Sequence, residues 1–411
     1  MDGESEILFG RVIRELASEK KISREEVVIV SKAGYVQGRN MVEAKAKIGE
    51  NSPYPEMVHY SPECWHCISP RFLEDQITRS LARLKMDTID VFLLHNPEYF
   101  LKVENDHREY YRRIEQAFTY LETEVKRGRI QFYGISSNTF PESREFPEFT
   151  SFETTLEIAE RISPSHHYAV IQFPFNLYEV GAWLNQDNSG KSLLEAAMQG
   201  GLGTLTNRPL NAFQENGMVR LADFPSHDEN QVRGDLKDSL TEVMALEAHY
   251  PARAVLPAQR FSWGHILKQN LEKLSDLDRW KQVRNHQILP ALTEACGQLV
   301  LHSEFKNWTD NYLKSTLKLF SAFTHYLECS ASRRSEEISK VLADVCPDLS
   351  YSRTLSQKSI QVYRAVPGIT SILVGMRSES YVQDCVAAMQ STPRVSEDDA
   401  LKILEALHNT Q

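Results

Sequence analysis

The stretch SLARLKMDTIDVFLLH, residues 80–95, contains the pattern that decides the fold. Its first five residues end an amphipathic segment, Pro70 to Leu84, in which apolar residues recur at helical spacing. Its last seven residues, Ile89 to His95, form an apolar run that is typical of a strand buried on both faces. A helix followed by such a strand is typical of a parallel α/β sheet.

The same apolar runs recur on both sides of this stretch. We expect six strands, at Val27 to Lys32, Ile89 to His95, Ile130 to Asn138, Tyr168 to Pro174, Leu202 to Asn207 and Ile369 to Gly375. We expect helices between most of them, namely a first helix capped by Ser5, then Pro70 to Leu84, His107 to Lys126, Phe152 to Ile162 and Ser192 to Met198. This alternation predicts parallel βα units.

One long region interrupts the alternation. From about residue 214 to residue 361 there is no convincing strand, and helical patterns such as Trp308 to Leu327 dominate. We therefore divide the chain into barrel-type βα units (1–213), a helical insertion (214–361), and the last strand with C-terminal helices (362–411). The insertion is rich in aromatic residues, which makes it a candidate surface for a protein partner.

The composition narrows the class of protein. The chain has 411 residues, 41% of them hydrophobic and 25% charged, which is typical of a soluble globular protein. A formal net charge of −10 argues against a nucleic-acid-binding surface and against a polybasic membrane anchor. No apolar run approaches the ~18 residues of a membrane span, and the N-terminus has no signal-peptide pattern. We expect a cytoplasmic protein, and leave open a targeting segment upstream of Met1.

Six cysteines are too few for a disulfide scaffold in a chain of 411 residues and suit a reducing compartment. Cys64 and Cys67 have the spacing of a zinc or redox pair, but the sequence has no second such pair to complete a zinc site. We interpret them as free thiols in a loop, and predict no metal site.

Polar residues stand at the ends of three expected strands, where a βα barrel places its catalytic and binding groups. Lys32 can lower the pKa of a neighbouring phenol through its charge, and His95 can donate a hydrogen bond to a carbonyl oxygen. Ser137 and Asn138 can hold a carboxamide. Each also has a simpler interpretation, as a surface lysine, a core histidine or loop-capping residues.

These residues and motifs resemble the aldo-keto reductase superfamily. Residues 80–95 are similar to the family block SLxRL…iDlyllH, and residues 128–138 are similar to GkIrxiGvSN. Gly375 to Ser378 resembles the GaRs turn, which in the family binds the 2′-phosphate side of NADPH. The resemblance spans both ends of the chain but not the insertion. It implies a (β/α)8 barrel that transfers hydride between NADPH and a small carbonyl or alcohol substrate.

The resemblance also implies the roles of individual residues. Lys32 and His95 are the implied catalytic residues. Gln172 meets the nicotinamide amide, and Arg208 and Leu210 stand where the family often has an aromatic ring under the nicotinamide. Asp384 is an acceptor for adenine or ribose groups, although the neighbouring Cys385 is a poor replacement for the family's amide. The implied ligands of NADP are Ser137, Asn138, Gln172, Arg208, Leu210, Gly375, Arg377 and Asp384.

One family segment has almost no counterpart. The general-acid tyrosine and its aspartate lie in a DTAxxYGxGxSE segment, of which this sequence matches only Gly3 to Glu6. Six expected strands instead of eight imply that the first two barrel strands are missing. Two interpretations are open: an incomplete form of an ordinary reductase, or an inactive barrel that serves as a nucleotide- or partner-binding module. Tyr35 is close to Lys32 in sequence, but nothing in the sequence fixes its geometry as a substitute acid.

Overall fold

The computed structural model describes residues 3–214, 217–376, 378–392 and 394–408. They form two compact units. The sheet unit comprises the described residues within Met1–Pro209, Ile360–Val382 and Val395–Gln411. The helical unit comprises those within Leu210–Ser359 and Gln383–Arg394.

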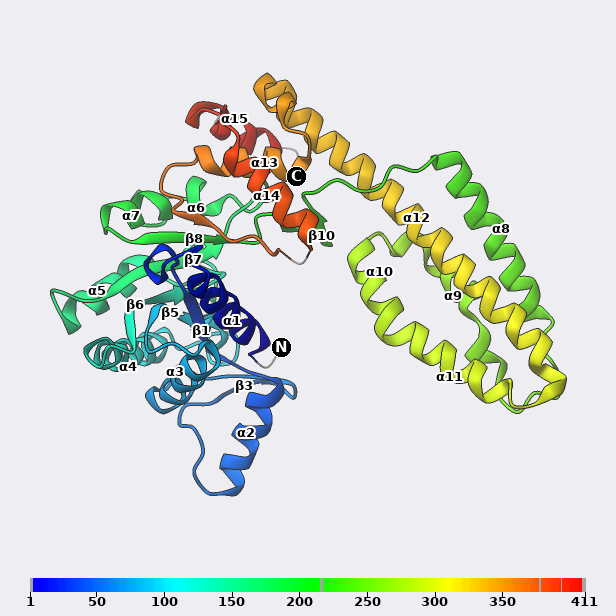
Figure 1. Ribbon diagram of the computed structural model, residues 1–411, viewed down its shortest axis with the longest axis horizontal. Helices are drawn as coiled ribbons and strands as arrows, with labels where there is room; N and C mark the ends of the chain where they lie inside the picture. Colours follow the sequence, from blue (N-terminus) through cyan, green and yellow to red (C-terminus); the bar gives the residue numbers. More distant parts are fainter. Residues whose placement is uncertain (1–2, 215–216, 377, 393, 409–411) are drawn as a thin grey trace. The chain divides into compact units, whose positions relative to one another are not determined.

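The sheet unit is built on a curled parallel sheet (Figure 1). Six described strands form it, in the order β1-β5-β6-β7-β8-β11. Their bounds are β1 (Val30–Ala33), β5 (Ile89–His95), β6 (Ile130–Ser136), β7 (Tyr168–Pro174), β8 (Gly203–Asn207) and β11 (Ser371–Ile372). Every neighbouring pair is parallel, which confirms the predicted α/β class. Completion of an eight-stranded barrel by two further strands stays a prediction.

Helices follow the strands of the sheet unit. They are α1 (Glu4–Ser18), α2 (Gly38–Gly49), α3 (Pro70–Leu84), α4 (His107–Lys126), α5 (Phe152–Ile162), α6 (Gly181–Leu184), α7 (Leu193–Gln199) and α15 (Glu397–His408). Helix α3 packs against β1, α4 against β6 and α7 against β8. Helices α13 (Leu355–Ala365) and α14 (Glu379–Gln390) each cross a boundary between the two units. A small antiparallel sheet, β2-β4-β3, joins β2 (Tyr35–Val36), β3 (Val58–Ser61) and β4 (Cys64–His66).

The two faces of the parallel sheet have different partners. On the outer face, the Phe118 ring of α4 lies 4.9 Å from the ring of Tyr133 and 4.8 Å from that of Tyr168, centroid to centroid. The inner face carries an apolar layer composed of Val30, Val91, Leu93, Val170 and Leu205. Gly134 belongs to this layer, because its strand register aligns it with Leu93 and Val170. A Cβ atom at Gly134 would lie 1.8 Å from the Val170 carbonyl oxygen, so only glycine fits.

Several local predictions need correction. Helix α1 begins at Glu4 and its N-cap is Gly3, not Ser5. Gly3 has a φ of 87°, which glycine tolerates, and acidic residues in the first turn favour the helix dipole. Cys64 lies in strand β4 rather than in a loop. Strand β1 begins three residues later than predicted, and β11 is limited to Ser371–Ile372.

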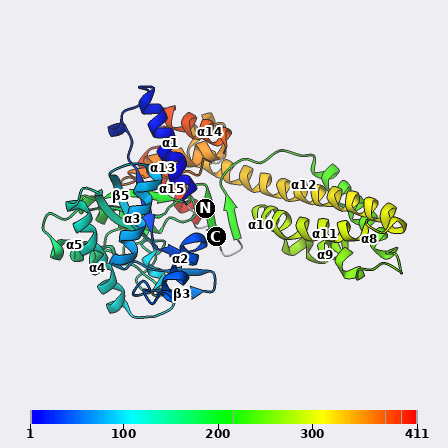
Figure 2. The same ribbon diagram turned by 60° about the horizontal axis from the view of Figure 1, so that its bottom comes forward.

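The helical unit is dominated by a helix of 40 residues, α12 (Lys306–Val345). Its other helices are α8 (Glu229–Ala248), α9 (Trp263–Asn270), α10 (Leu277–Val283) and α11 (Leu289–Leu299), the last preceded by a π-helical turn at Arg284–Ile288. Helices α8 and α12 lie side by side along much of their length (Figures 1 and 2). Large apolar side chains such as Trp280, Phe320 and Phe323 form the unit's core.

One part of the helical unit is not helical. Strands β9 (Asn211–Gln214) and β10 (Gly217–Arg220) pair antiparallel, although no strand is predicted between Asn207 and the last expected strand at Ile369. Strands of four residues are too short to give a clear alternating pattern, so the sequence does not reveal them.

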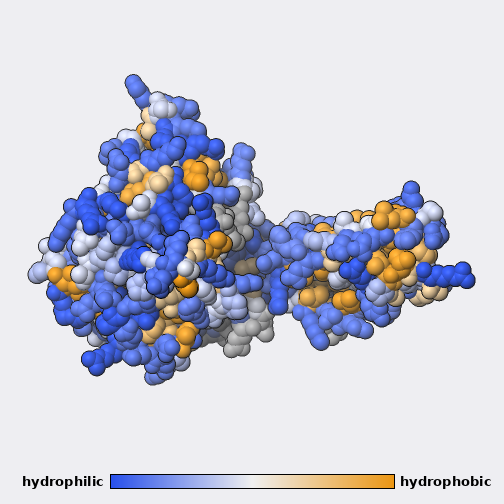
Figure 3. All heavy atoms as spheres, turned by 90° about the horizontal axis from the view of Figure 1, so that it is seen from below, coloured by the Kyte–Doolittle hydropathy of each residue, from blue (hydrophilic) through white to orange (hydrophobic). Residues whose placement is uncertain are grey.

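The surface of the chain is mostly hydrophilic on the face shown in Figure 3, with apolar residues in small groups. Within the described ranges, every helix is too short or too polar to cross a lipid bilayer.

Candidate functional site

Strand register gathers polar side chains at the carboxyl end of the inner face. His95 aligns with Ser136, and Ser136 with Gln172. Lys32 aligns with Leu93, which is two residues before His95 in β5. Asn207 aligns with Pro174, which is two residues after Gln172 in β7. Aligned residues share a face, as do residues two apart in one strand. Lys32, His95, Ser136, Gln172 and Asn207 therefore project from the same face, and we call these five residues the polar row.

Lys32 and Gln172 are in direct contact across the curl of the sheet. The Lys32 Nζ atom donates a hydrogen bond to Gln172 Oε1 at 3.0 Å, although strands β5 and β6 separate their own strands. Burial lowers the pKa of Lys32 to about 8. The ammonium group is therefore a much stronger acid than an exposed lysine, yet it stays mostly protonated at neutral pH.

His95 is held as a neutral imidazole. Burial is the main reason that the pKa of His95 is lowered to about 3, and electrostatic interactions with Lys32 and His66 add to the effect. Its backbone carbonyl accepts a hydrogen bond from His66 Nε2 at 2.7 Å. Gly34 allows this approach, because a Cβ atom there would lie 2.2 Å from the same carbonyl oxygen. A neutral imidazole in this position can donate one N–H to a ligand oxygen.

Tyr35 packs directly beside His95, which the sequence did not indicate. The two rings meet edge to face with centroids 4.8 Å apart, and Tyr99 contacts the Tyr35 ring in the same way at 4.9 Å. The Tyr35 hydroxyl accepts a hydrogen bond from Asn96 Nδ2 at 2.8 Å. Burial, reinforced by a hydrogen bond to Tyr99, raises the pKa of Tyr35. Tyr35 therefore stays protonated and positions the ring of His95.

Two of the predicted NADP ligands, Asn138 and Arg208, contact each other. Arg208 Nη2 donates a hydrogen bond to Asn138 Oδ1 at 2.8 Å, and Arg208 Nη1 forms an ion pair with Glu179 Oε1 at 2.7 Å. Arg208 has a φ of 54°, an uncommon backbone conformation for a residue with a side chain. The guanidinium plane is thus fixed by two partners at the end of β8.

Glu98 is a functional candidate that sequence reasoning missed. It is buried, and its Oε1 atom accepts a hydrogen bond from the backbone N–H of Asn138 at 3.0 Å. Its Oε2 atom has no hydrogen-bond partner among the described residues. Burial outweighs the surrounding hydrogen bonds and raises the pKa of Glu98 to about 7. The available signal was an acidic residue set within an apolar stretch just after His95.

Ser137 does not occupy the position that the sequence implied. Its hydroxyl lies in a buried cluster with the hydroxyls of Thr139 and Thr150, at 3.1 and 3.2 Å. Ser136, one residue earlier, is the serine aligned with His95 and Gln172. A shift of one residue along a strand reverses the face, which explains the difference. The Ser136 hydroxyl and the Asn207 Oδ1 atom are buried without partners in the described ranges.

The remaining predicted ligands lie elsewhere. Gly375 is exposed beyond β11, and Arg377 lies outside the described residues. Leu210 and Asp384 are assigned to the helical unit. There the Asp384 carboxylate accepts hydrogen bonds from Thr354 and Gln357, both at 2.8 Å, and from Ser356. The roles of these four residues in binding NADP stay predictions.

Both cysteines of the pair are shielded from solvent. Cys64 and Cys67 are both buried free thiols, as interpreted from the sequence. Cys67 Sγ lies 3.2 Å from Ser69 Oγ and 3.4 Å from the Pro55 carbonyl oxygen. Burial raises the pKa of Cys67, so its reactive thiolate form is disfavoured.

A cavity of about 560 Å³ lies next to Tyr35 in the sheet unit. Arg39, Arg79 and Arg83 line it, and each has an acidic partner. Arg39 and Arg79 pair with Glu43, and Arg83 pairs with Glu6. Because Arg39 and Arg79 share Glu43, two carboxylates offset the charge of three guanidinium groups.

The chain is similar in sequence to one protein family and in structure to several solved proteins. The family profile described as "Aldo/keto reductase family" matches residues 1–248. Among similar solved structures is the holo form of an aldo-keto reductase from Bacillus halodurans, at 12% identity and a TM-score of 0.44, with 98% of this chain and 78% of that chain covered. Another is an aldo/keto reductase from Klebsiella pneumoniae in complex with NADP and acetate, at 15% identity and a TM-score of 0.41, with 99% and 77% covered. A comparison with curated protein sequences finds no match.

The family match covers more than half of the 411 residues. It includes the strands β1, β5, β6, β7 and β8, from which the whole polar row projects. The chain therefore belongs to the aldo/keto reductase family, a family of oxidoreductases.

Proposed function

We propose that the polar row binds NADP(H) together with a small carbonyl or alcohol compound, and that hydride passes between them. Family membership supports the reaction class, and the relative that carries NADP in its structure supports the cofactor. When bound, NADPH supplies the hydride, while the protein supplies orientation and a proton. The single observation that carries the proposal is the Lys32–Gln172 hydrogen bond of 3.0 Å on the face that also holds neutral His95.

The residues present fit the carboxamide of a nicotinamide. A carboxamide offers two N–H donors and one carbonyl acceptor. Asn207 Oδ1 and the Ser136 hydroxyl are buried groups whose hydrogen-bonding capacity no described residue satisfies. Buried polar groups normally have partners, so these two groups suit a polar ligand. Gln172 lies between their strands, on β7, and its amide adds both a donor and an acceptor.

The chemistry at the substrate oxygen would come from two residues. Negative charge develops on a carbonyl oxygen as hydride reaches the carbon. The neutral His95 imidazole would donate an N–H to that oxygen, because its pKa of about 3 keeps it uncharged. The Lys32 ammonium would release a proton to it, because a pKa of about 8 brings it close to neutral pH. Alcohol oxidation would use the same groups in reverse.

Steady-state kinetics on the full chain test this assignment. NADPH consumption would be followed with an aromatic aldehyde as substrate. We expect Lys32→Met to lower kcat by at least about 100-fold, because general acid catalysis contributes about 10²–10⁴-fold. Lys32→Arg keeps the charge but does not release a proton, so it should lower kcat similarly while leaving KM nearly unchanged. Lys126→Met, at an exposed lysine of the same unit, is the matched control.

The pH profile separates a proton donor from a merely structural lysine. Reduction requires the protonated form of Lys32, so kcat/KM should fall as pH rises through about 8. Rates equal to wild type in Lys32→Met would contradict the catalytic assignment. NADPH binding without turnover in the wild-type chain would support the inactive nucleotide-binding module instead.

A further inference from the structure

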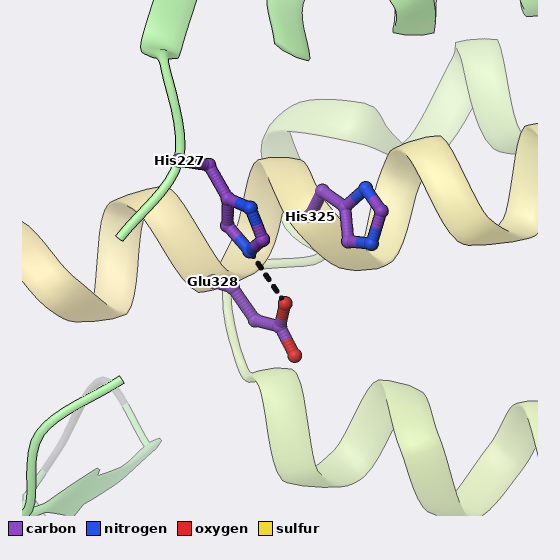
Figure 4. A group of neighbouring side chains, drawn as sticks. All are labelled: His227, His325 and Glu328. Carbon is purple, nitrogen blue, oxygen red and sulfur yellow. Dashed lines mark hydrogen bonds and ion pairs between the residues drawn. The ribbon is translucent and has the colours of Figure 1, made fainter. Parts of the chain in front are cut away.

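Three metal-ligating side chains meet in the helical unit, apart from the polar row. They are His227, His325 and Glu328, and one ligand atom from each lies within 4.8 Å of the other two (Figure 4). His325 and Glu328 are three residues apart on α12, so they share one face of that helix. His227 comes from the segment just before α8. Two imidazoles and one carboxylate thus converge from two separate parts of the chain.

The contacts within the cluster leave ligand atoms available. His227 Nε2 lies 3.0 Å from Glu328 Oε2, and the His227 and His325 rings are 4.7 Å apart, centroid to centroid. His325 is exposed, and its ring nitrogens have no hydrogen-bond partner within the described part of the chain. The other carboxylate oxygen, Glu328 Oε1, accepts a hydrogen bond from Lys281 Nζ at 3.0 Å. Among the contacts of the described residues, only the one between His227 and Glu328 would have to be replaced by a metal bond.

The surrounding structure holds the three residues in place. Asp228, next to His227, caps α8 by accepting a hydrogen bond from the Gln231 N–H at 3.0 Å. Glu229 then pairs with Arg333 of α12 at 3.0 Å, which ties the start of α8 to the same helix as His325 and Glu328. On the other side, Trp280 Nε1 donates to Thr324 Oγ1 at 2.9 Å and fixes α10 against α12. Contacts with α8, α10 and α12 therefore hold the segment that carries His227 close to His325 and Glu328.

The donor set selects the class of ion. Two imidazoles with one carboxylate are typical ligands of Zn²⁺ and related divalent transition metals, whereas Ca²⁺ and Mg²⁺ prefer oxygen ligands alone. Tetrahedral zinc with bonds of about 2.0–2.1 Å needs ligand atoms about 3.3 Å apart. Rotation of the exposed His325 side chain would close most of the remaining distance. Three protein ligands leave the fourth position to water.

We propose that His227, His325 and Glu328 form a zinc site that clamps the start of α8 onto α12. Both imidazoles bind in their neutral form and Glu328 binds through Oε2, while Lys281 keeps its bond to Oε1. The site is independent of the hydride-transfer proposal, because none of its residues belongs to the polar row.

Zinc titration of the full chain, purified without a histidine tag and stripped with a chelator, tests the proposal. The probe is Zn²⁺ alone, in competition with a chromophoric chelator. We expect one tight zinc ion per chain, and an affinity lowered at least about tenfold in His325→Ala and in His227→Ala. His325 is exposed, so its variant should fold normally. His286→Ala, at another exposed histidine of the same unit, is the matched control and should bind like wild type.

A second readout excludes the buried thiols as the zinc site. The double variant Cys64→Ser, Cys67→Ser should keep the wild-type zinc affinity, and Co²⁺ bound in place of zinc should give the visible absorption of a nitrogen–oxygen site without thiolate bands. Binding that survives in His325→Ala and His227→Ala would overturn the proposal. So would the absence of tight zinc binding by the wild-type chain, since Glu328 would then serve only as the partner of His227 and Lys281.

Discussion

The polar row contains two basic side chains, Lys32 and His95. The pKa of each is lowered, but the two values lie on opposite sides of neutral pH. Burial lowers the pKa of Lys32 to about 8, close enough to neutral pH for proton release. Burial and two neighbouring charges lower the pKa of His95 to about 3, so it stays a neutral hydrogen-bond donor. Groups whose pKa values are driven apart in one site are suited to different roles. This difference is why we assign the proton to Lys32 and orientation of the oxygen to His95.

Glu98 provides a residue-scale prediction about stability. Its pKa is about 7 in the folded chain, above the ordinary value of 4.5, so the folded state retains a proton that the unfolded state loses between these values. The stability of the wild-type chain therefore falls as pH rises from about 4.5 to about 7. Glu98→Gln removes the buried charge and still accepts the Asn138 hydrogen bond. We expect it to stabilise the fold by about 1–3 kcal/mol at pH 8 and much less at pH 5.

Urea denaturation of Glu98→Gln at the two pH values measures this difference. Glu104→Gln, at an exposed glutamate nearby, should have little effect at either pH. Equal stabilisation by Glu98→Gln at pH 5 and pH 8 would show that the buried charge is not the cause.

At the scale of single elements, strand β6 determines how tightly the inner face is packed. Gly134→Ala would place a Cβ atom 1.8 Å from the Val170 carbonyl oxygen and 2.8 Å from Leu93 Cδ2. Backbone atoms of a central strand yield little, so we expect a loss of about 1–3 kcal/mol or more in unfolding free energy. Gly49→Ala, with no atom within 4 Å of the added Cβ, is the control and should be nearly neutral. Wild-type stability in Gly134→Ala would mean that β6 and β7 are not packed as described.

Elements with a clear apolar period were predictable from sequence, whereas helix α2 was not predicted although it has 12 residues. Helices α3, α4 and α5 and strands β5 and β7 have the predicted bounds, because each combines a clear apolar period with distinct ends. Strand β10 was missed, since four residues give too few alternations. The choice between Ser136 and Ser137 depended on a single residue of register, which no periodicity fixes. Glu98 and Tyr35 were missed as members of the site because tertiary packing, not spacing, brings them to Asn138 and His95.

At the scale of the whole molecule, the chain divides into a unit that carries the polar row and a unit that carries the zinc cluster. Sequence alone indicated a helical region near residues 214–361, whereas compactness assigns Leu210–Ser359 and Gln383–Arg394 to the helical unit. The sequence did not indicate that Gln383–Arg394 belongs to this unit, because packing rather than chain continuity joins it to Leu210–Ser359. The proposals of hydride transfer at the polar row and of zinc binding at His227, His325 and Glu328 therefore concern different units, and each can be tested without the other.

Isothermal titration calorimetry with NADPH and the full chain decides whether the polar row holds the cofactor. We expect one NADPH per wild-type chain, and an affinity at least about tenfold lower in Gln172→Leu, because lost hydrogen bonds to a buried ligand cost about 1–3 kcal/mol. Gln131→Leu, at an exposed glutamine of the same sheet, should bind like wild type. No NADPH binding by the wild-type chain, or equal affinity in Gln172→Leu with its fold intact, would contradict the assignment of the polar row.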